Sequence, residues 1–132
     1  MPTLSREELI LAPLVEAEEK HGELYELVYD ALFASYPDYR DLFILDSDGG
    51  LRRNMLRTTM DMIVDYAHDA LDEGYLYGMR LNHIHYGVDE DAFDQFFEVI
   101  AQVAAREAPD QWTPATAQAW AEMKTEFAQT RD

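Results

Sequence analysis

Apolar residues recur along this chain at the three- and four-residue spacing of amphipathic helices, and no segment alternates as a strand would. The clearest stripe lies in residues 23–35 and consists of Leu24, Leu27, Val28, Ala31 and Leu32. A long helix is expected over about 51–71, with Leu56, Met60, Ile63 and Ala67 on one face. The pattern therefore predicts an all-α fold.

Capping residues and prolines predict where the helices of the first half begin and end. Ser5 and Glu8 have the spacing of a capping box, which opens a first helix that reaches about Lys20. Pro13 falls inside that helix, where proline either kinks or breaks it. Pro37 ends the second helix and suits the first position of a short new one.

The second half predicts three more helices. A short one near 75–85 carries Leu76, Met79 and His83 on one face, and Gly87 suits its C-terminal cap. The next has an acidic start and a bulky apolar face made of Phe93, Phe96, Phe97, Ile100 and Ala104. The last begins at Thr113-Pro114 and is expected to bury Trp120, Met123 and Phe127. About seven helices of unequal length then form one domain over residues 1–132.

Composition narrows the functional classes. The 132 residues suit one domain, and 48% hydrophobic with 28% charged residues is an ordinary globular balance. The lack of cysteine excludes disulfides and thiolate metal sites. A net charge of −17 repels phosphate backbones and anionic lipids, so no nucleic acid and no membrane is expected as a partner. Without a signal-peptide pattern or a spanning apolar run, we expect a cytoplasmic protein.

One metal-site pattern is nearly present and fails. Asp46-x-Asp48-x-Gly50 resembles the start of a calcium loop. The positions that need Gly and a bidentate Glu hold Leu51 and Arg57, and a cation replaces the main ligand. We therefore interpret the segment as a solvated turn between helices.

The four histidines are unequal candidates for a ligand. His21 and His68 lie at predicted helix ends and are expected on the surface. His83 and His85 stand about 200° apart around a helix, so only one can face a given pocket. His83 continues the apolar stripe of Met79, whereas His85 points away from it. Because a histidine on an apolar face is usually a core residue, two interpretations of His83 remain open, a core residue and a ligand.

Two polar residues lie beside predicted buried faces. Tyr29 flanks the stripe of the second helix, and Arg52 lies one turn before Leu56 on the long helix. A buried polar ligand would use such donors. Each residue also has an ordinary interpretation, as a core tyrosine and as a surface charge whose stem lies on apolar neighbours.

Together these segments resemble a bacterial globin, namely the single-domain haemoglobins and the haem domain of flavohaemoglobins. The stretch VYDALFASYPDYRDLF (28–43) is similar to the segment in which the family's second helix runs into its short third helix. The resemblance makes Tyr29 the family's tyrosine on the second helix, Pro37 its corner proline and Phe43 the phenylalanine that wedges the haem. The stretch HIHYGV is similar to the proximal signature His-x-x-x-Gly-Val, which selects His83.

The resemblance implies a three-over-three globin fold around a slot for haem b. His83 is then the iron ligand through Nε2, and its Nδ1–H donates to a backbone carbonyl near Met79. Tyr29 and Arg52 are the implied distal donors, with Arg52 facing either the iron or a haem propionate. The implied haem-binding residues are Tyr29, Phe43, Arg52, Leu56, Met79, His83, Val88 and Phe93.

Three departures from the family pattern refine the implied function. Arg52 stands where the family often has Gln, Lys124 lies near the position of the Tyr that supports the proximal histidine, and we expect no reductase domain. Without that supporting Tyr, the resemblance implies that the imidazole of His83 is less anionic than in flavohaemoglobins, which disfavours peroxidase-like chemistry. The implied function is reversible binding of O2, NO or CO, extended to nitric oxide dioxygenase activity if a separate reductase supplies electrons. The alternative is a haem-free globin-fold sensor or protein-interaction module.

Overall fold

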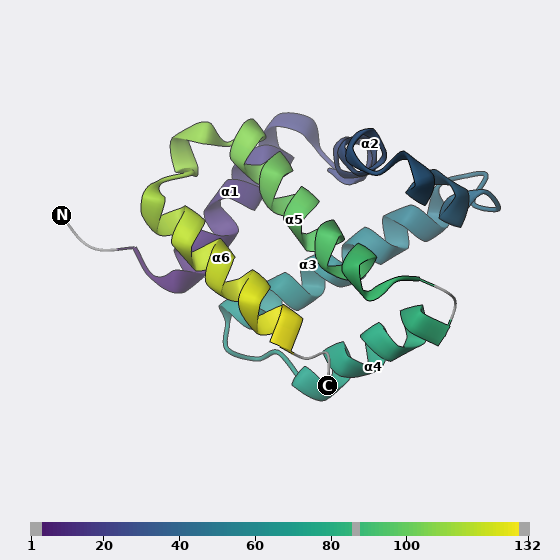
Figure 1. Ribbon diagram of the computed structural model, residues 1–132. Coiled ribbons are helices and arrows are strands. Elements are labelled where there is room, and N and C mark those ends of the chain that lie inside the picture. Colours follow the sequence, from purple (N-terminus) through teal and green to yellow (C-terminus); the bar gives the residue numbers. More distant parts are fainter. Residues whose placement is uncertain (1–3, 86–87, 130–132) are drawn as a thin grey trace.

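The computed structural model describes residues 4–85 and 88–129, which contain six α-helices, two 3-10 helices and no strand (Figure 1). The all-α prediction is thereby confirmed, while Gly87, the expected cap, lies outside the described residues. In chain order the elements are α1 (Arg6–His21), α2 (Tyr25–Ser35), η1 (Pro37–Phe43), α3 (Gly50–Ala67), α4 (Glu73–His85), α5 (Glu90–Glu107), η2 (Pro109–Gln111) and α6 (Pro114–Ala128).

Helix α1 begins at the predicted capping box. The Ser5 hydroxyl accepts the backbone N–H of Glu8 at 3.2 Å, and the Glu8 carboxylate accepts the backbone N–H of Ser5 at 3.3 Å. The helix continues through Pro13, so of the two expected effects, a kink or a break, the break does not occur. Ile10 and Leu14 on either side of the proline are buried, and their packing holds the helix together across the one hydrogen bond that proline removes.

The ends of α3 and α4 follow from local backbone chemistry. Helix α3 ends at Ala67, four residues before the predicted end, because Asp69 adopts the left-handed conformation with φ of 57°. Helix α4 begins at Glu73, slightly earlier than predicted, and the Asp72 carboxylate accepts the backbone N–H of Gly74 at 2.9 Å. These two ends shorten α3 and lengthen α4 relative to the apolar pattern.

Helix α5 is the centre of the molecule and packs against α1, α2, α4 and α6 (Figure 1). Its N-terminus is capped by Asp89, whose carboxylate accepts the backbone N–H of Asp91 at 2.9 Å. The expected cap of α6 is also present, since the Thr113 hydroxyl accepts the N–H of Thr116 at 3.2 Å. The three residues expected on the inner face of α6 are buried: Trp120, Met123 and Phe127.

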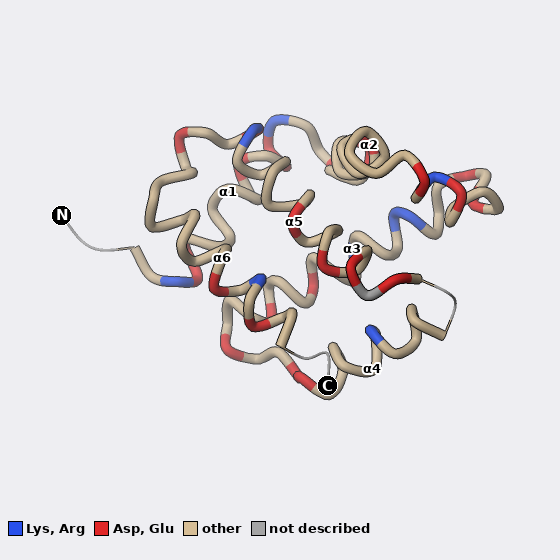
Figure 2. The backbone as a smooth tube through the Cα atoms, in the orientation of Figure 1, with Lys and Arg blue, Asp and Glu red and all other residues tan. Residues whose placement is uncertain are grey.

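Charge is spread unevenly over this framework. Acidic residues occur along α1, α3, α5 and α6, whereas α4 has one acidic residue, at its first position, and one basic residue, Arg80 (Figure 2). Among the helices of the described residues, none has the length and apolar character needed to cross a membrane.

Candidate functional site

A cavity of about 650 Å³ lies between α3, α4 and α5 and is closed on one side by α2 and η1. Its size is within the usual range for cofactor and small-molecule sites. Most of its lining is apolar or aromatic, and His83 is the one histidine among the described lining residues. The lining comprises Leu32, Tyr39, Leu42, Phe43, Leu51, Asn54, Met55, Thr58, Thr59, Met62, Met79, Asn82, His83, Val88, Ala92, Phe93, Phe96 and Phe97.

The imidazole of His83 is held in one orientation. Its Nδ1 lies 2.7 Å from the backbone carbonyl oxygen of Met79, one turn earlier on α4. Because a carbonyl can only accept, Nδ1 carries a proton, and in the neutral imidazole Nε2 then has the lone pair. Among the described residues Nε2 has no hydrogen-bond partner. The hydrogen bond expected near Met79 is therefore confirmed, and the free nitrogen suits a metal ligand.

Two residues that follow α4 pack around the same imidazole. The ring of Phe93 meets that of His83 edge-on, with centroids 5.3 Å apart and planes at 73°. Val88 lines the cavity, and its N–H donates to the carbonyl oxygen of His83 at 2.9 Å. Met79, His83, Val88 and Phe93 thus form one wall of the cavity, as the resemblance places them.

The other histidines lie elsewhere. His85 is exposed and does not line the cavity, as helix phase predicts. His21 and His68 lie at the ends of α1 and α3 and contact the carboxylates of Glu107 and Glu7, at 2.8 and 2.9 Å. The described part of the chain holds no group of three or more His, Cys, Asp or Glu side chains that could bind a metal ion.

Tyr29 is buried next to the cavity and does not line it. Its ring packs against Phe33, Phe43 and Phe96 with centroids 5.5–5.9 Å apart, and the last two also line the cavity. Its hydroxyl is buried without a hydrogen-bond partner in the described structure. Burial raises the pKa of Tyr29 far above its ordinary value, and the nearby Arg52 charge opposes this only in part. The group is therefore a neutral donor.

Arg52 points away from the cavity. Its Nε donates to the Asp46 carboxylate at 3.0 Å, and its backbone N–H donates to the same oxygen at 3.0 Å. Arg52 and Tyr29 line a separate hollow of about 330 Å³ together with Tyr25. Burial alone would raise the pKa of Asp46, but the hydrogen bonds from Leu51 and Arg52 outweigh it and lower the pKa.

Leu56 also lies outside the cavity lining, because it faces the core on the side of α1 and α2. The face of α3 that lines the cavity is offset by one position and presents Met55, Thr59 and Met62, which sequence reasoning missed. Each residue along a helix turns the side chain by about 100°, so a one-residue error moves a side chain to another face. The Met55 and Met62 pair, seven residues apart, was the available signal.

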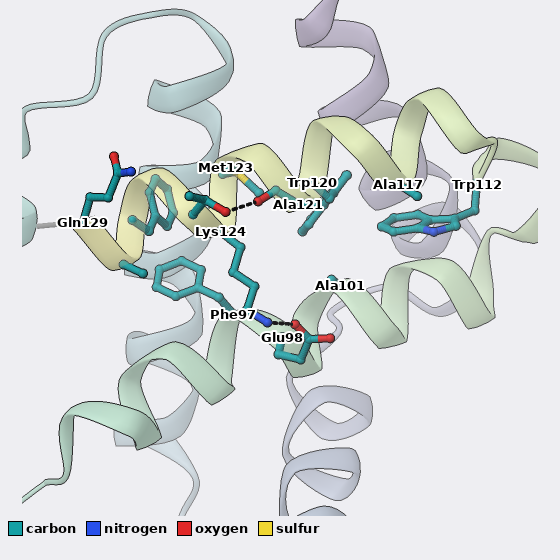
Figure 3. A pocket seen from close by; sticks show the side chains of 13 residues that line it. Phe97, Glu98, Ala101, Trp112, Ala117, Trp120, Ala121, Met123, Lys124 and Gln129 are labelled. Carbon is teal, nitrogen blue, oxygen red and sulfur yellow. Dashed lines mark hydrogen bonds and ion pairs between the residues drawn. The ribbon is translucent and has the colours of Figure 1, made fainter.

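A second cavity, of about 570 Å³, lies between α5 and α6 (Figure 3). Trp112, Trp120 and Met123 line it, and Phe97 lines both this cavity and the first. Lys124 forms an ion pair with Glu98 at its edge. Lys124 thus contacts α5 and is not part of the lining around His83.

A comparison with protein-family models matches residues 26–130 to the model described as Globin. The match includes α2 to α6, and therefore every element that lines the cavity with His83. No curated protein and no solved structure matches the chain at a significant level.

Proposed function

Because this chain belongs to the globin family, whose members typically bind haem and diatomic gases, we propose that it is a haem-binding globin that binds such a gas reversibly. The observation that carries the proposal is His83, on the wall of a largely apolar cavity, with Nδ1 bound to the Met79 carbonyl and Nε2 without a hydrogen-bond partner among the described residues. We also propose that the protein is a globin of the single-domain bacterial type.

The residues around the cavity fit a haem. The volume of about 650 Å³ and the largely apolar lining suit a flat hydrophobic macrocycle. Phe43 and Phe93 provide aromatic walls on η1 and α5, and Met55 and Met62 provide flexible apolar contacts on α3. His83 would hold the haem through Nε2, and a bound haem would supply an iron centre able to bind a diatomic gas.

The proximal side favours gas binding over peroxidase-like chemistry. The Nδ1–H of His83 donates to a neutral carbonyl, which gives the imidazole less anionic character than a carboxylate partner would. Lys124, near the position where flavohaemoglobins support the histidine, pairs instead with Glu98. We therefore propose a moderately basic proximal ligand.

On the distal side we propose that Tyr29, which packs behind Phe43 and Phe96, turns toward the cavity and donates to a polar gas. Its neutral hydroxyl has no partner among the described residues, so donation to a gas breaks no existing hydrogen bond. Such a bond to a partly charged acceptor is worth about 1.5–3 kcal/mol, roughly ten- to a hundredfold in the rate of gas release. Arg52, held by Asp46, lies near Tyr29 outside the cavity, and the two charges shift the pKa of Tyr29 in opposite directions.

Absorption spectroscopy with matched histidine variants tests the haem site. We expect the protein mixed with hemin to show a Soret band, and its ferrous form to bind CO and O2 reversibly. His83→Ala should lose both properties, while His85→Ala, an exposed neighbour on the same helix, should keep them. The opposite pattern would refute His83 as the ligand, and a colourless wild-type mixture would support the haem-free sensor or interaction module.

We further propose that nitric oxide detoxification is the physiological use of this site. Conversion of NO and O2 to nitrate needs one electron per turnover, which a separate reductase must supply. The test is nitrate formation from NO by the O2-loaded ferrous protein, with His83→Ala as the control. If NO is instead retained unreacted, the protein is a gas carrier.

A further inference from the structure

Arg80 is a fully buried arginine on α4, one turn before His83. Its Nη2 donates to the Asp94 carboxylate on α5 at 2.5 Å and to the Phe127 carbonyl oxygen on α6 at 2.6 Å. Its guanidinium carbon lies 4.6 Å from the centroid of the Phe93 ring. One side chain of α4 is thus joined to both neighbouring helices.

Burial of a charge is costly unless partners satisfy it, so a buried arginine implies a specific task. The planar guanidinium can serve a carboxylate, a carbonyl and an aromatic face at once, which a lysine ammonium cannot do in the same geometry. Arg80 is 2% exposed, and its carboxylate partner Asp94 is 16% exposed in its side chain. The pair is therefore shielded from the solvent that weakens surface ion pairs.

Helix α4 is held in place by few buried residues. Its buried residues are Leu76 and Arg80, and its main packing partner is α5. Figure 1 shows α4 at the edge of the molecule, next to α5 and the end of α6. Leu76 fixes the first half of the helix by packing, whereas Arg80 fixes the half that carries His83.

The contacts continue from Arg80 to the imidazole. Phe93 receives the guanidinium on its face at 4.6 Å and meets the His83 ring edge-on at 5.3 Å. Arg80 and His83 are three residues apart and therefore share a side of α4. Phe93 is held between a fixed cation and the candidate ligand.

We infer that Arg80 is a positioning residue for His83, acting by anchoring α4 to α5 and α6 and by holding Phe93 against the imidazole. The inference rests on the proposed function only in that His83 Nε2 is the ligand atom. In flavohaemoglobins the proximal histidine is supported from a position that corresponds to the neighbourhood of Lys124 in this chain. In this protein the supporting residues are instead Arg80 and Asp94.

The test compares matched variants. The double variant Arg80→Met with Asp94→Leu removes both charges of the pair, so neither partner is left facing a vacated one. Arg80→Lys keeps the charge and loses the planar fork. Arg106→Met is the control, since Arg106 lies on α5, is exposed and pairs with Glu107 at 3.0 Å.

The first measurement uses the haem-free protein, so it does not depend on haem binding. Proton NMR resonances of the His83 ring, identified by their loss in His83→Ala, should be displaced by the neighbouring Phe93 ring in the wild type. In the double variant they should move to the position of a free histidine, and Arg80→Lys should restore them partly. His85 resonances and the Arg106→Met spectrum should not change.

The second measurement is the iron–histidine stretching band in the resonance Raman spectrum of the haem-loaded ferrous protein. It should shift and broaden in the double variant. A double variant that unfolds cooperatively in urea and keeps the wild-type His83 resonances overturns the inference. If that variant does not fold, unchanged His83 resonances in Arg80→Lys overturn it equally. A wild type without haem affinity refutes the proposed function alone, because the NMR comparison still decides the role of Arg80.

Discussion

Replacement of Tyr29 by Phe should make the haem-free protein more stable. The hydroxyl of Tyr29 is buried in an aromatic cluster and has no hydrogen-bond partner among the described residues. In the unfolded chain the same hydroxyl is solvated by water. Folding therefore removes a hydrogen bond at this position and gives none back, which Tyr29→Phe avoids while the ring contacts with Phe43 and Phe96 remain.

The magnitude follows from the cost of an unpaired buried group. Leaving a buried hydroxyl without a partner costs about 1–3 kcal/mol. The Phe ring fills the same space except for one oxygen atom, so cavity formation subtracts little from this gain. We expect Tyr29→Phe to raise the free energy of unfolding by about 1–2 kcal/mol. The haem-loaded variant should release O2 roughly ten to a hundred times faster, because the proposed donor is gone.

Urea denaturation of the haem-free wild type and variant measures the stability change. Tyr66→Phe is the matched control, since Tyr66 is also buried but its hydroxyl donates to the Glu126 carboxylate. Burial, together with this carboxylate, raises the pKa of Tyr66 to about 12, so its hydroxyl stays a donor at neutral pH. Loss of that bond should lower the free energy of unfolding by about 1 kcal/mol, the opposite sign.

A Tyr29→Phe variant that is less stable than the wild type would refute the reasoning, because it would mean that the hydroxyl is satisfied in the folded protein. If stability rises while the O2 release rate stays unchanged, Tyr29 is not the distal donor. The two measurements therefore separate the structural claim about the hydroxyl from the functional one.

Three further predictions concern stability. Ile63→Ala should lower the free energy of unfolding by about 2–5 kcal/mol in urea titrations because Ile63 is fully buried, whereas the exposed Ile44→Ala should change it by less than about 0.5 kcal/mol. Thr113→Ala should cost about 1 kcal/mol through loss of the α6 cap, and Thr113→Ser should recover most of it; equal losses in both variants would contradict a capping role. Because the pKa of Asp46 is lower folded than unfolded, its contribution is present above the unfolded pKa of about 3.9 and is lost as the pH falls through the folded pKa. Asp46→Asn should therefore be less stable at pH 7 and lose less stability than the wild type as the pH falls below about 4, and a variant with the acid profile of the wild type would contradict this assignment.

Helix starts were predictable because their signals are local. A hydroxyl and an N–H three residues apart form a cap whatever the rest of the chain does, as Ser5 and Thr113 show. The fate of Pro13 was less predictable, since the packing of its buried neighbours comes from distant helices. The same holds for the end of α3, which depends on the left-handed conformation of Asp69.

The residues of the candidate site were likewise predictable where the signal is local, and not where it depends on distant contacts. Met79 and His83 share one helix and lie close in sequence to Val88 and Phe93, so helical spacing and the resemblance together place all four beside one cavity. Which residues of α3 line the cavity depends on how that helix is rotated about its axis against the rest of the molecule. The apolar pattern of the sequence identified the side of α3 that faces the core. The orientation of Arg52 was not predictable because its partner, Asp46, lies in the preceding loop, where helical periodicity gives no information.

Arg80 was not predicted as a buried residue. A charged side chain within an amphipathic pattern is expected at the surface. Its partners are 14 and 47 residues further along the chain, at Asp94 and Phe127, so no local spacing points to them. Only the folded arrangement of α4, α5 and α6 brings these groups together.

The cavity beside His83 ties the folding equilibrium of this chain to the concentration of whatever fills it. About 650 Å³ bounded by α3, α4 and α5 exists only when those helices are assembled, so an occupant binds the native state and not the unfolded one. At a free concentration one hundred times its dissociation constant, an occupant adds about 2.7 kcal/mol to the stability of the fold. A cell short of that molecule would therefore hold a larger unfolded fraction of the protein, and its supply would set the lifetime of the chain against proteolysis.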